Sequence, residues 1–195
     1  FEKRVDYIIR QLSLISFSMP SFYLALIFII VFSVNFNLFP IAGLHSIEEK
    51  TGFAEYIDMA WHLFLPISVM IFVGLGSMII YIRSLTLEIL KSDYYYFALS
   101  RGLSQKQLLR FYIIPNLLPP IVTLLGLSLP GLIGGSVILE SIFGIDGMGQ
   151  LFFMSALSRD YPVIMGTLMI TSFLTLLGNI IADLILLKLN PYNKI

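Results

Sequence analysis

Cysteine is absent from the 195 residues, and charged residues are scarce. The lack of cysteine excludes disulfides and thiolate metal sites within this sequence. The two histidines, His45 and His62, come without the further ligands that a metal site needs. Asp, Glu, Lys and Arg make up 12% of the residues against 57% hydrophobic ones, and the mean hydropathy is +0.90. Such a composition argues against a soluble globular domain.

Sequence motifs of nucleotide binding and catalysis are missing as well. No G-x-x-x-x-G-K-[ST] occurs, so the sequence has no P-loop with which to bind ATP. It contains no H-E-x-x-H motif and no recognisable Ser, His and Asp set. Gly144, Gly147 and Gly149 have the reverse of the dinucleotide-binding spacing, and no strand is predicted before them. We therefore expect a protein that is not an enzyme and that binds no cofactor itself.

Long apolar runs dominate what is present. Four windows contain no Asp, Glu, Lys or Arg: 11–47, 59–82, 111–139 and 161–182. A membrane helix needs about 20 apolar residues to cross about 30 Å of hydrocarbon, and each window supplies them. We predict an all-α integral membrane protein, a polytopic helical bundle, rather than the buried helices of a large soluble protein. The predicted membrane helices lie near 12–34, 63–82, 115–139 and 163–187.

The segments between these helices differ in charge. Residues 1–10, 83–114 and 188–195 carry ten Lys and Arg, whereas 35–62 and 140–162 carry only two. Cytoplasmic loops of membrane proteins are enriched in Lys and Arg. Both ends of the chain and the 83–114 segment are therefore predicted to be cytoplasmic, with the other two segments outside.

The start of the chain is a charged amphipathic stretch, FEKRVDYIIR, without an initiator methionine. We expect a fragment that lacks upstream membrane helices. A processed or renumbered chain would begin in the same way.

Both segments predicted outside contain amphipathic helical patterns. In residues 53–64, aromatic and apolar residues recur at three- and four-residue spacing, as in a helix lying at the membrane interface. Residues 151–157 form an apolar patch after a glycine-rich turn. We predict a short helix there, against the outer face of the membrane.

The third apolar run is interrupted by helix-breaking residues. They are Pro115, Pro119, Pro120, Gly126, Pro130, Gly131, Gly134 and Gly135. Membrane helices tolerate such residues where neighbouring groups satisfy the freed backbone, and glycines permit close helix approach. A closely packed helix and a bent helix that lines a path both remain open.

Polar residues are rare in the last apolar run. Asn179 and Asp183 are four residues apart, so they lie on one face of a helix. Polar side chains within membranes usually face the interior of the bundle. Asp183 is also close enough to Lys188 for simple charge pairing near the end of the helix.

The segment 83–114 has the signals of a helix–glycine–helix corner. Asp93 can cap a first helix over Tyr94–Arg101, and Gly102 suits the left-handed position that ends a helix. Ser104 and Gln107 have the S-x-x-Q spacing of a capping box, which predicts that a second helix begins there.

One face of the first predicted helix is aromatic and basic: Tyr94, Phe97, Ala98 and Arg101 share it by their spacing. A connecting loop with capped helices explains the caps. A docking surface for a cytoplasmic partner also explains the aromatic residues, since such residues dominate protein interfaces.

Residues 93–123, DYYYFALSRGLSQKQLLRFYIIPNLLPPIVT, resemble the EAA signature of ABC-importer permeases. They are most similar to the dipeptide, oligopeptide and nickel branch, with its pattern D-Y-x-x-T-A-x-x-K-G-L-S…N-x-x-x-P-V-V-T. The matching positions are Asp93, Tyr94, Ala98, Gly102, Leu103, Ser104, Asn116, Pro120, Val122 and Thr123.

The resemblance extends over essentially the whole chain. Further matches, in the order of the family pattern, are Ser18, Pro20, Ser21, Phe22, Glu140, Phe143, Gly147, Gly149, Arg159, Asp160, Tyr161, Pro162, Gly166, Asn179, Asp183 and Pro191. The sequence departs from that pattern at Tyr96, Phe97, Asp146, Gln150 and Asn190. These departures concern the details of ATPase contact and outer-face docking.

The resemblance implies a single permease domain over 1–195, the C-terminal part of a subunit with six membrane helices. The segment 93–114 would be the cytoplasmic coupling loop. The residues it implies for ATPase coupling are Tyr94, Phe97, Ala98, Arg101, Gly102, Leu103 and Ser104. The residues it suggests for the translocation path or gating are Asn116, Pro120, Glu140, Asn179 and Asp183.

The resemblance also implies partners and a location. It implies a second related permease subunit, two cytoplasmic ATPases that carry ATP and Mg²⁺, an extracytoplasmic solute-binding protein and membrane lipid, but no nucleic acid. The implied location is the bacterial plasma (inner) membrane, as a multi-pass protein. The expected solute is a peptide; nickel or another metal chelate, a sugar, and a passive channel function remain alternatives.

Overall fold

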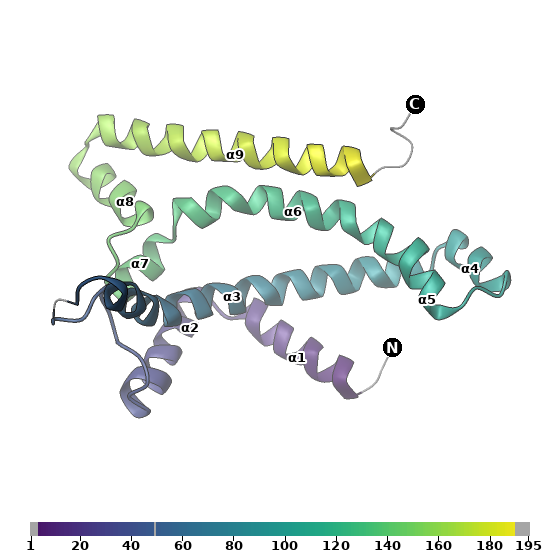
Figure 1. The fold of residues 1–195 in the computed structure, drawn as a ribbon, viewed down its shortest axis with the longest axis horizontal. Helices are drawn as coiled ribbons and strands as arrows, with labels where there is room; N and C mark the ends of the chain where they lie inside the picture. Colours follow the sequence, from purple (N-terminus) through teal and green to yellow (C-terminus); the bar gives the residue numbers. More distant parts are fainter. Residues whose placement is uncertain (1–3, 49, 190–195) are drawn as a thin grey trace. The chain divides into compact units, whose positions relative to one another are not determined.

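The computed structural model describes residues 4–48 and 50–189, and in this part of the chain all regular structure is helical (Figure 1). The elements are α1 (Arg4–Ser18), α2 (Ser21–Phe28), the π-helical η1 (Ile29–Asn35), α3 (Phe53–Leu90), α4 (Asp93–Ser100), α5 (Gln105–Leu108), the π-helical η2 (Leu109–Ile113), α6 (Ile114–Gly134), α7 (Val137–Phe143), α8 (Met148–Ser158) and α9 (Tyr161–Leu189). The predicted all-α class is confirmed.

Two compact units make up the chain. The first contains the described residues up to Met78 together with Gly134–Thr167. The second contains Ile79–Ile133 and the described residues from Leu168 onward. Helices α3 and α9 each contribute one part to either unit.

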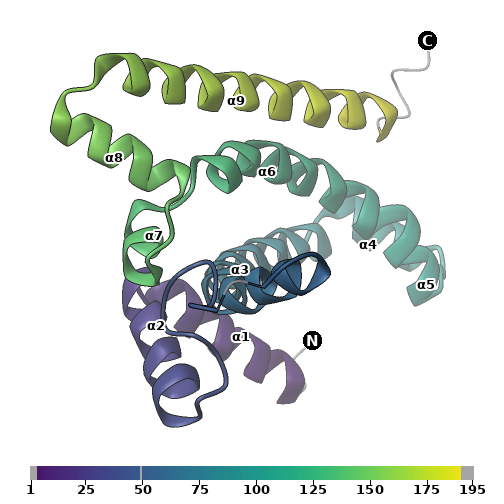
Figure 2. The same cartoon turned by 60° about the vertical axis from the view of Figure 1, so that its left-hand side comes forward.

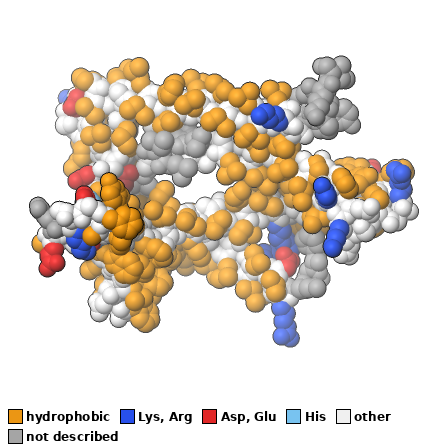
Figure 3. Space-filling model, in the orientation of Figure 1, with side chains coloured by type: hydrophobic (Ala, Val, Ile, Leu, Met, Phe, Trp, Pro, Cys, Tyr) orange, Lys and Arg blue, Asp and Glu red, His pale blue; other side chains and the backbone are white. Residues whose placement is uncertain are grey.

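Within the described part of the chain, three helical stretches are long and apolar enough to cross a membrane: Phe53–Leu90, Gln105–Ser128 and Tyr161–Leu189. Most of their large apolar side chains are exposed, and Figure 3 shows hydrophobic side chains along the visible sides of the long helices. In a protein of this composition, such surfaces suit lipid rather than water. The spans predicted at 63–82 and 163–187 lie inside α3 and α9.

The span predicted at 12–34 is divided in two. Helix α1 ends at Ser18, α2 begins at Ser21, and the chain bends by 107° between α1 and the α2–η1 stretch. Pro20 is the N-cap of α2, with an extended backbone at ψ 138°. A proline lacks the N–H that a continuous helix needs and disfavours helical backbone in the residue before it, so the helix stops there.

The core of the first unit is formed by α2, α3 and α7. Its buried residues are Leu24, Ala25, Leu65, Val69, Leu139 and Phe143. Helix α1 adds a close contact with α3, because a Cβ atom at Gly76 would overlap the side chain of Ser16. The Ser16 hydroxyl donates a hydrogen bond to the carbonyl of Phe72. The small residues therefore bring the two backbones together.

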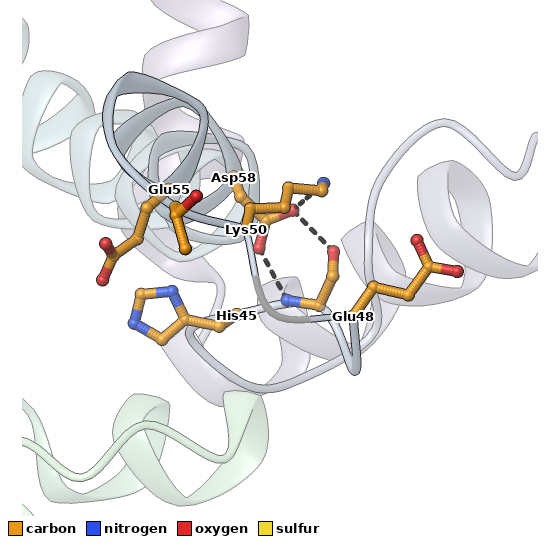
Figure 4. A pocket seen from close by; sticks show the side chains of 7 residues that line it. His45, Glu48, Lys50, Glu55 and Asp58 are labelled. Atoms are coloured by element: carbon orange, nitrogen blue, oxygen red, sulfur yellow. Dashed lines mark hydrogen bonds and ion pairs between the residues drawn. The ribbon is translucent and has the colours of Figure 1, made fainter.

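The loop before α3 is folded against the first turns of that helix. Asp58 is buried and accepts hydrogen bonds from the Ser46 backbone N–H (2.6 Å), the Ser46 hydroxyl (2.5 Å) and the Lys50 ammonium (2.5 Å). Figure 4 shows these contacts beside a cavity of about 380 Å³ that His45, Glu48 and other residues of this segment line.

The predicted interfacial helix over 53–64 is part of α3 rather than a separate element. Its faces differ: Asp58 and His62 are buried, whereas Phe53 and Trp61 are exposed. Residues 53–65 contain no proline or glycine that would end the helix before the apolar run. Pro66 follows and is accommodated inside the continuous helix.

Candidate functional site

The helix–glycine–helix corner of the second unit begins directly after α3. Ser92 is the N-cap of α4, with an extended backbone at φ −78° and ψ 148°, and its carbonyl accepts from the N–H groups of Tyr95 and Tyr96. The prediction that Asp93 caps this helix is wrong, because Asp93 is its first helical residue. The carboxylate of Asp93 still lies in the first turn, where it complements the positive end of the helix dipole.

Gly102 forms the turn of the corner. Its φ of +76° is in the left-handed region, as predicted, and its N–H donates to the carbonyl of Leu99 at 3.0 Å. Gly102 is exposed, and a Cβ atom there would meet nothing within 4 Å. The requirement for glycine is therefore set by the backbone conformation and not by crowding.

The predicted capping box at the start of α5 is present. The side-chain oxygen of Gln107 accepts from the backbone N–H and from the hydroxyl of Ser104, both at 2.9 Å. From Gln105 the chain continues through η2 into α6 without a break, and Gln105–Ser128 is one helical stretch. The π-helical turn at η2 precedes Pro115, where the proline ring would otherwise crowd the preceding turn.

The surface of the corner is aromatic and basic, in part as predicted. Tyr94 is 42% and Phe97 64% exposed, and the guanidinium of Arg101 lies 5.9 Å from the centre of the Phe97 ring. Ala98 shares the spacing of these residues but is fully buried, so it supports the corner from inside. Leu103 is half-buried and Ser104 is exposed.

Further exposed apolar residues widen this surface beyond the predicted set: Tyr96, Leu99, Leu109 and Phe111. The first two lie on α4 beside the predicted face, and their spacing gave no reason to include them. Figure 3 shows Lys and Arg side chains among the hydrophobic ones on this segment. We call the exposed residues of 94–111 the corner surface.

The residues suggested for a translocation path are spread over several elements. On α6, Asn116 is exposed and its amide donates to the Tyr112 carbonyl in the preceding turn, η2, at 2.7 Å, while Pro120 is half-buried. On α9, Asn179 is half-buried and Asp183 is exposed. Their role in a path stays a prediction.

Glu140 differs from these residues because it is buried in the first unit. Its carboxylate accepts from the backbone N–H groups of Gly149 (3.3 Å) and Gln150 (2.6 Å), at the start of α8. Helices α7 and α8 meet there at a bend of 102° (Figure 2). The carboxylate therefore joins two helices of one unit, an arrangement that the sequence did not indicate.

Residues 1–193 match the family described as "Binding-protein-dependent transport system inner membrane component". The chain belongs to this family. The resemblance to ABC-importer permeases is thereby confirmed, and the described apolar helices are those of a multi-pass inner-membrane protein.

Several permease proteins of peptide transport systems are similar to the chain. An oligopeptide transport system permease protein of Bacillus subtilis (strain 168) is 37% identical over 188 residues, covering 96% of this chain and 58% of the relative. A di/tripeptide transport system permease protein of Pseudomonas aeruginosa (strain UCBPP-PA14) is 32% identical over 201 residues, covering 95% and 60%. A dipeptide transport system permease protein of Escherichia coli (strain K12) is 29% identical over 204 residues, covering 95% and 60%.

The chain thus spans about three-fifths of the length of the curated relatives that it matches. These relatives are named as permeases of transport systems and not as enzymes. The corner surface lies inside the part of the chain that the family covers.

Proposed function

We propose that the chain is part of the transmembrane subunit of an ATP-driven importer, and that the corner surface binds a cytoplasmic ATPase subunit. The observation that carries the proposal is the capped corner, which presents exposed aromatic side chains directly before an uninterrupted apolar helix. Exposed apolar residues in water are costly unless a partner covers them, so a surface of this kind favours a docking role.

The continuous helix from Gln105 to Ser128 supplies the mechanical link in this proposal. ATP and Mg²⁺ would bind to the partner subunits, since this sequence contains no P-loop. Closure of two ATPase subunits would displace the corner, and α6 would carry that displacement into the membrane as a change between two packed arrangements. The solute would then be exposed to each side in turn.

The partners proposed for this cycle are a second related permease subunit, two ATPases, an extracytoplasmic solute-binding protein and lipid. Orientation follows from the distribution of Lys and Arg, which favours cytoplasmic ends and a cytoplasmic corner. Peptides are the proposed solutes, because the relatives named above are permeases of oligopeptide and dipeptide systems. Nickel or another metal chelate and a sugar are the alternatives.

A matched pair of phenylalanines tests the ATPase contact. Phe97 on the corner and Phe173 on α9 are 64% and 62% exposed. In vesicles containing the complete transporter, Phe97→Ala should lower ATP-dependent dipeptide uptake and co-purification of the ATPase, and Phe173→Ala should change neither. Unchanged uptake and co-purification in Phe97→Ala would contradict the docking role. Uptake by wild type that needs no ATP would favour a passive channel instead.

A further inference from the structure

Glu140 is a buried carboxylate whose partners are backbone N–H groups. Among the described residues, the hydrogen bonds to its side chain come from Gly149 and Gln150, in the first turn of the eleven-residue α8. A buried charge is stable only where hydrogen bonds and opposite charge compensate for lost water. Here the orphan N–H groups and the positive end of the α8 dipole supply both.

Three glycines leave the space that this carboxylate fills. A Cβ atom at Gly135 would overlap its Oε1, and one at Gly149 would lie 3.1 Å from its Oε2. At Gly147 the three nearest atoms to an added Cβ are the Cδ of Glu140 at 2.5 Å and its two oxygens at 2.7 and 2.8 Å.

Gly147 is informative because its backbone would accept any residue. Its φ of −96° and ψ of 179° are extended values, unlike the left-handed φ of +66° at Gly135. Gly149 is also crowded by the backbone nitrogen of Val137, at 2.9 Å from an added Cβ. Of these three glycines, Gly147 alone is crowded only by Glu140. Gly135 is also restricted by its own φ, and Gly149 by a neighbouring backbone atom.

The carboxylate also connects α8 to the core of the first unit. Leu139 and Phe143, which flank Glu140 on α7, are core residues that pack with α2 and α3. Leu151, Phe153 and Met154 of α8 are exposed. The position of α8 relative to that core therefore depends on the turn that Glu140 holds.

We propose that Glu140 is a positioning residue that keeps α7 and α8 together as one rigid hairpin during transport, with Gly147 leaving room for its carboxylate. The proposal rests on the proposed importer function, because it makes the hairpin a moving part of alternating access. If the angle between α7 and α8 is fixed, α8 moves together with the core of the first unit. If that angle varies, α8 does not follow the movement of the core.

A distance measurement tests the hairpin directly. The sequence has no cysteine, so Ser141→Cys on α7 and Met154→Cys on α8, both exposed, can carry spin labels in the full-length subunit once any cysteine elsewhere is replaced. We expect one narrow distance distribution, the same without nucleotide and with trapped ATP. Glu140→Ala and Gly147→Ala should each broaden it, while Gly166→Ala, whose Cβ would meet nothing within 4 Å, should not.

A double variant of Glu140 and Gly147 distinguishes a positioning role of Glu140 from a general loss of stability. Gly147→Ala should lower uptake per ATP hydrolysed roughly tenfold, the change expected when a buried charged hydrogen-bonding group is displaced. In a Glu140→Ala background, the same substitution should have no further effect, because the atoms it would meet are gone. Glu140→Gln keeps the size of the side chain and should give an intermediate loss.

Three results would overturn the proposal: an unchanged distance distribution in Glu140→Ala and Gly147→Ala, additive losses in the double variant, or normal uptake despite a broadened distribution. The distance measurement does not depend on transport activity, so it tests the α7–α8 arrangement independently of the proposed function. Absence of ATP-dependent uptake in the wild-type complex would instead count against that function.

Discussion

Gly126 of α6 lies directly against Ala182 of α9. A Cβ atom added at Gly126 would be 2.6 Å from the Cβ of Ala182 and 2.8 Å from the carbonyl oxygen of Gly178. The two helices, both within the second unit at this point, therefore approach at a crossing of small residues. In lipid, where helices gain little from hiding apolar surface, such close backbone contact is a main source of helix association.

Gly126→Ala should therefore destabilise the second unit, by about 1–3 kcal/mol if the crossing cannot widen. The measurement is unfolding of the full-length subunit in mixed micelles with increasing denaturing detergent. Gly131→Ala on the same helix is the control, since its Cβ would meet nothing within 4 Å. Equal unfolding midpoints for the two variants would show that the crossing adds no stability.

Gly102→Asp should leave membrane insertion intact and uncouple ATP hydrolysis from uptake. Its backbone φ of +76° is unfavourable for a side chain by about 1–2 kcal/mol, and the new charge would lie on the exposed corner. Uptake and hydrolysis are measured together in vesicles, with Gly74→Ala as the control in open space on α3. Undiminished uptake in Gly102→Asp would contradict coupling through the corner.

Asp58→Asn should release the loop before α3. The neutral amide forms no ion pair with the Lys50 ammonium, and it is a weaker acceptor for the N–H and hydroxyl of Ser46. Amide hydrogen exchange of residues 45–48 and 50 should rise by roughly tenfold, as expected for the loss of a charged hydrogen-bond set. Glu55→Gln, an exposed acid lining the same cavity, should leave exchange unchanged, and equal exchange rates in both variants would argue against the role of Asp58.

Single cysteines test the predicted orientation. Ser100→Cys on the corner should react with a membrane-impermeant thiol reagent only in inside-out vesicles, because the positive charge distribution predicts a cytoplasmic corner. Ile47→Cys, in the exposed loop before α3, should react only in right-side-out vesicles. Labelling of both positions from the same side would overturn this topology.

Local backbone signals allowed the corner to be predicted almost residue by residue. A left-handed glycine and a capping box depend on a few neighbouring residues, so Gly102, Ser104 and Gln107 could be assigned from spacing alone. The cap of α4 was misplaced by one residue. Ser92 and Asp93 are both good caps, and only the turn at the end of α3, where the Ser92 hydroxyl donates to the Ile89 carbonyl, decides between them.

Tertiary features were harder to predict, because hydropathy indicates the length of an apolar segment and not where the chain bends within it. The predicted span 12–34 contains no charged residue, yet the chain bends by 107° at Pro20 inside it. The family resemblance grouped Glu140 with residues of a translocation path. Its burial against the start of α8 depends on the 102° bend between α7 and α8, which only the folded structure displays.

The continuous helix from the corner to Ser128 also fixes the rotation of α5 relative to α6 about their common helix axis. With about 100° of rotation per residue, the direction in which α5 faces is fixed by the number of residues between it and the apolar part of α6. The π-helical turn at Leu109–Ile113 is part of that count. Deleting one residue there would preserve the corner and the membrane segment individually, but would turn one relative to the other by more than a quarter of a circle. In the proposed importer, the length of this short turn would therefore determine which side of α6 is aligned with the ATPase-binding face of the corner.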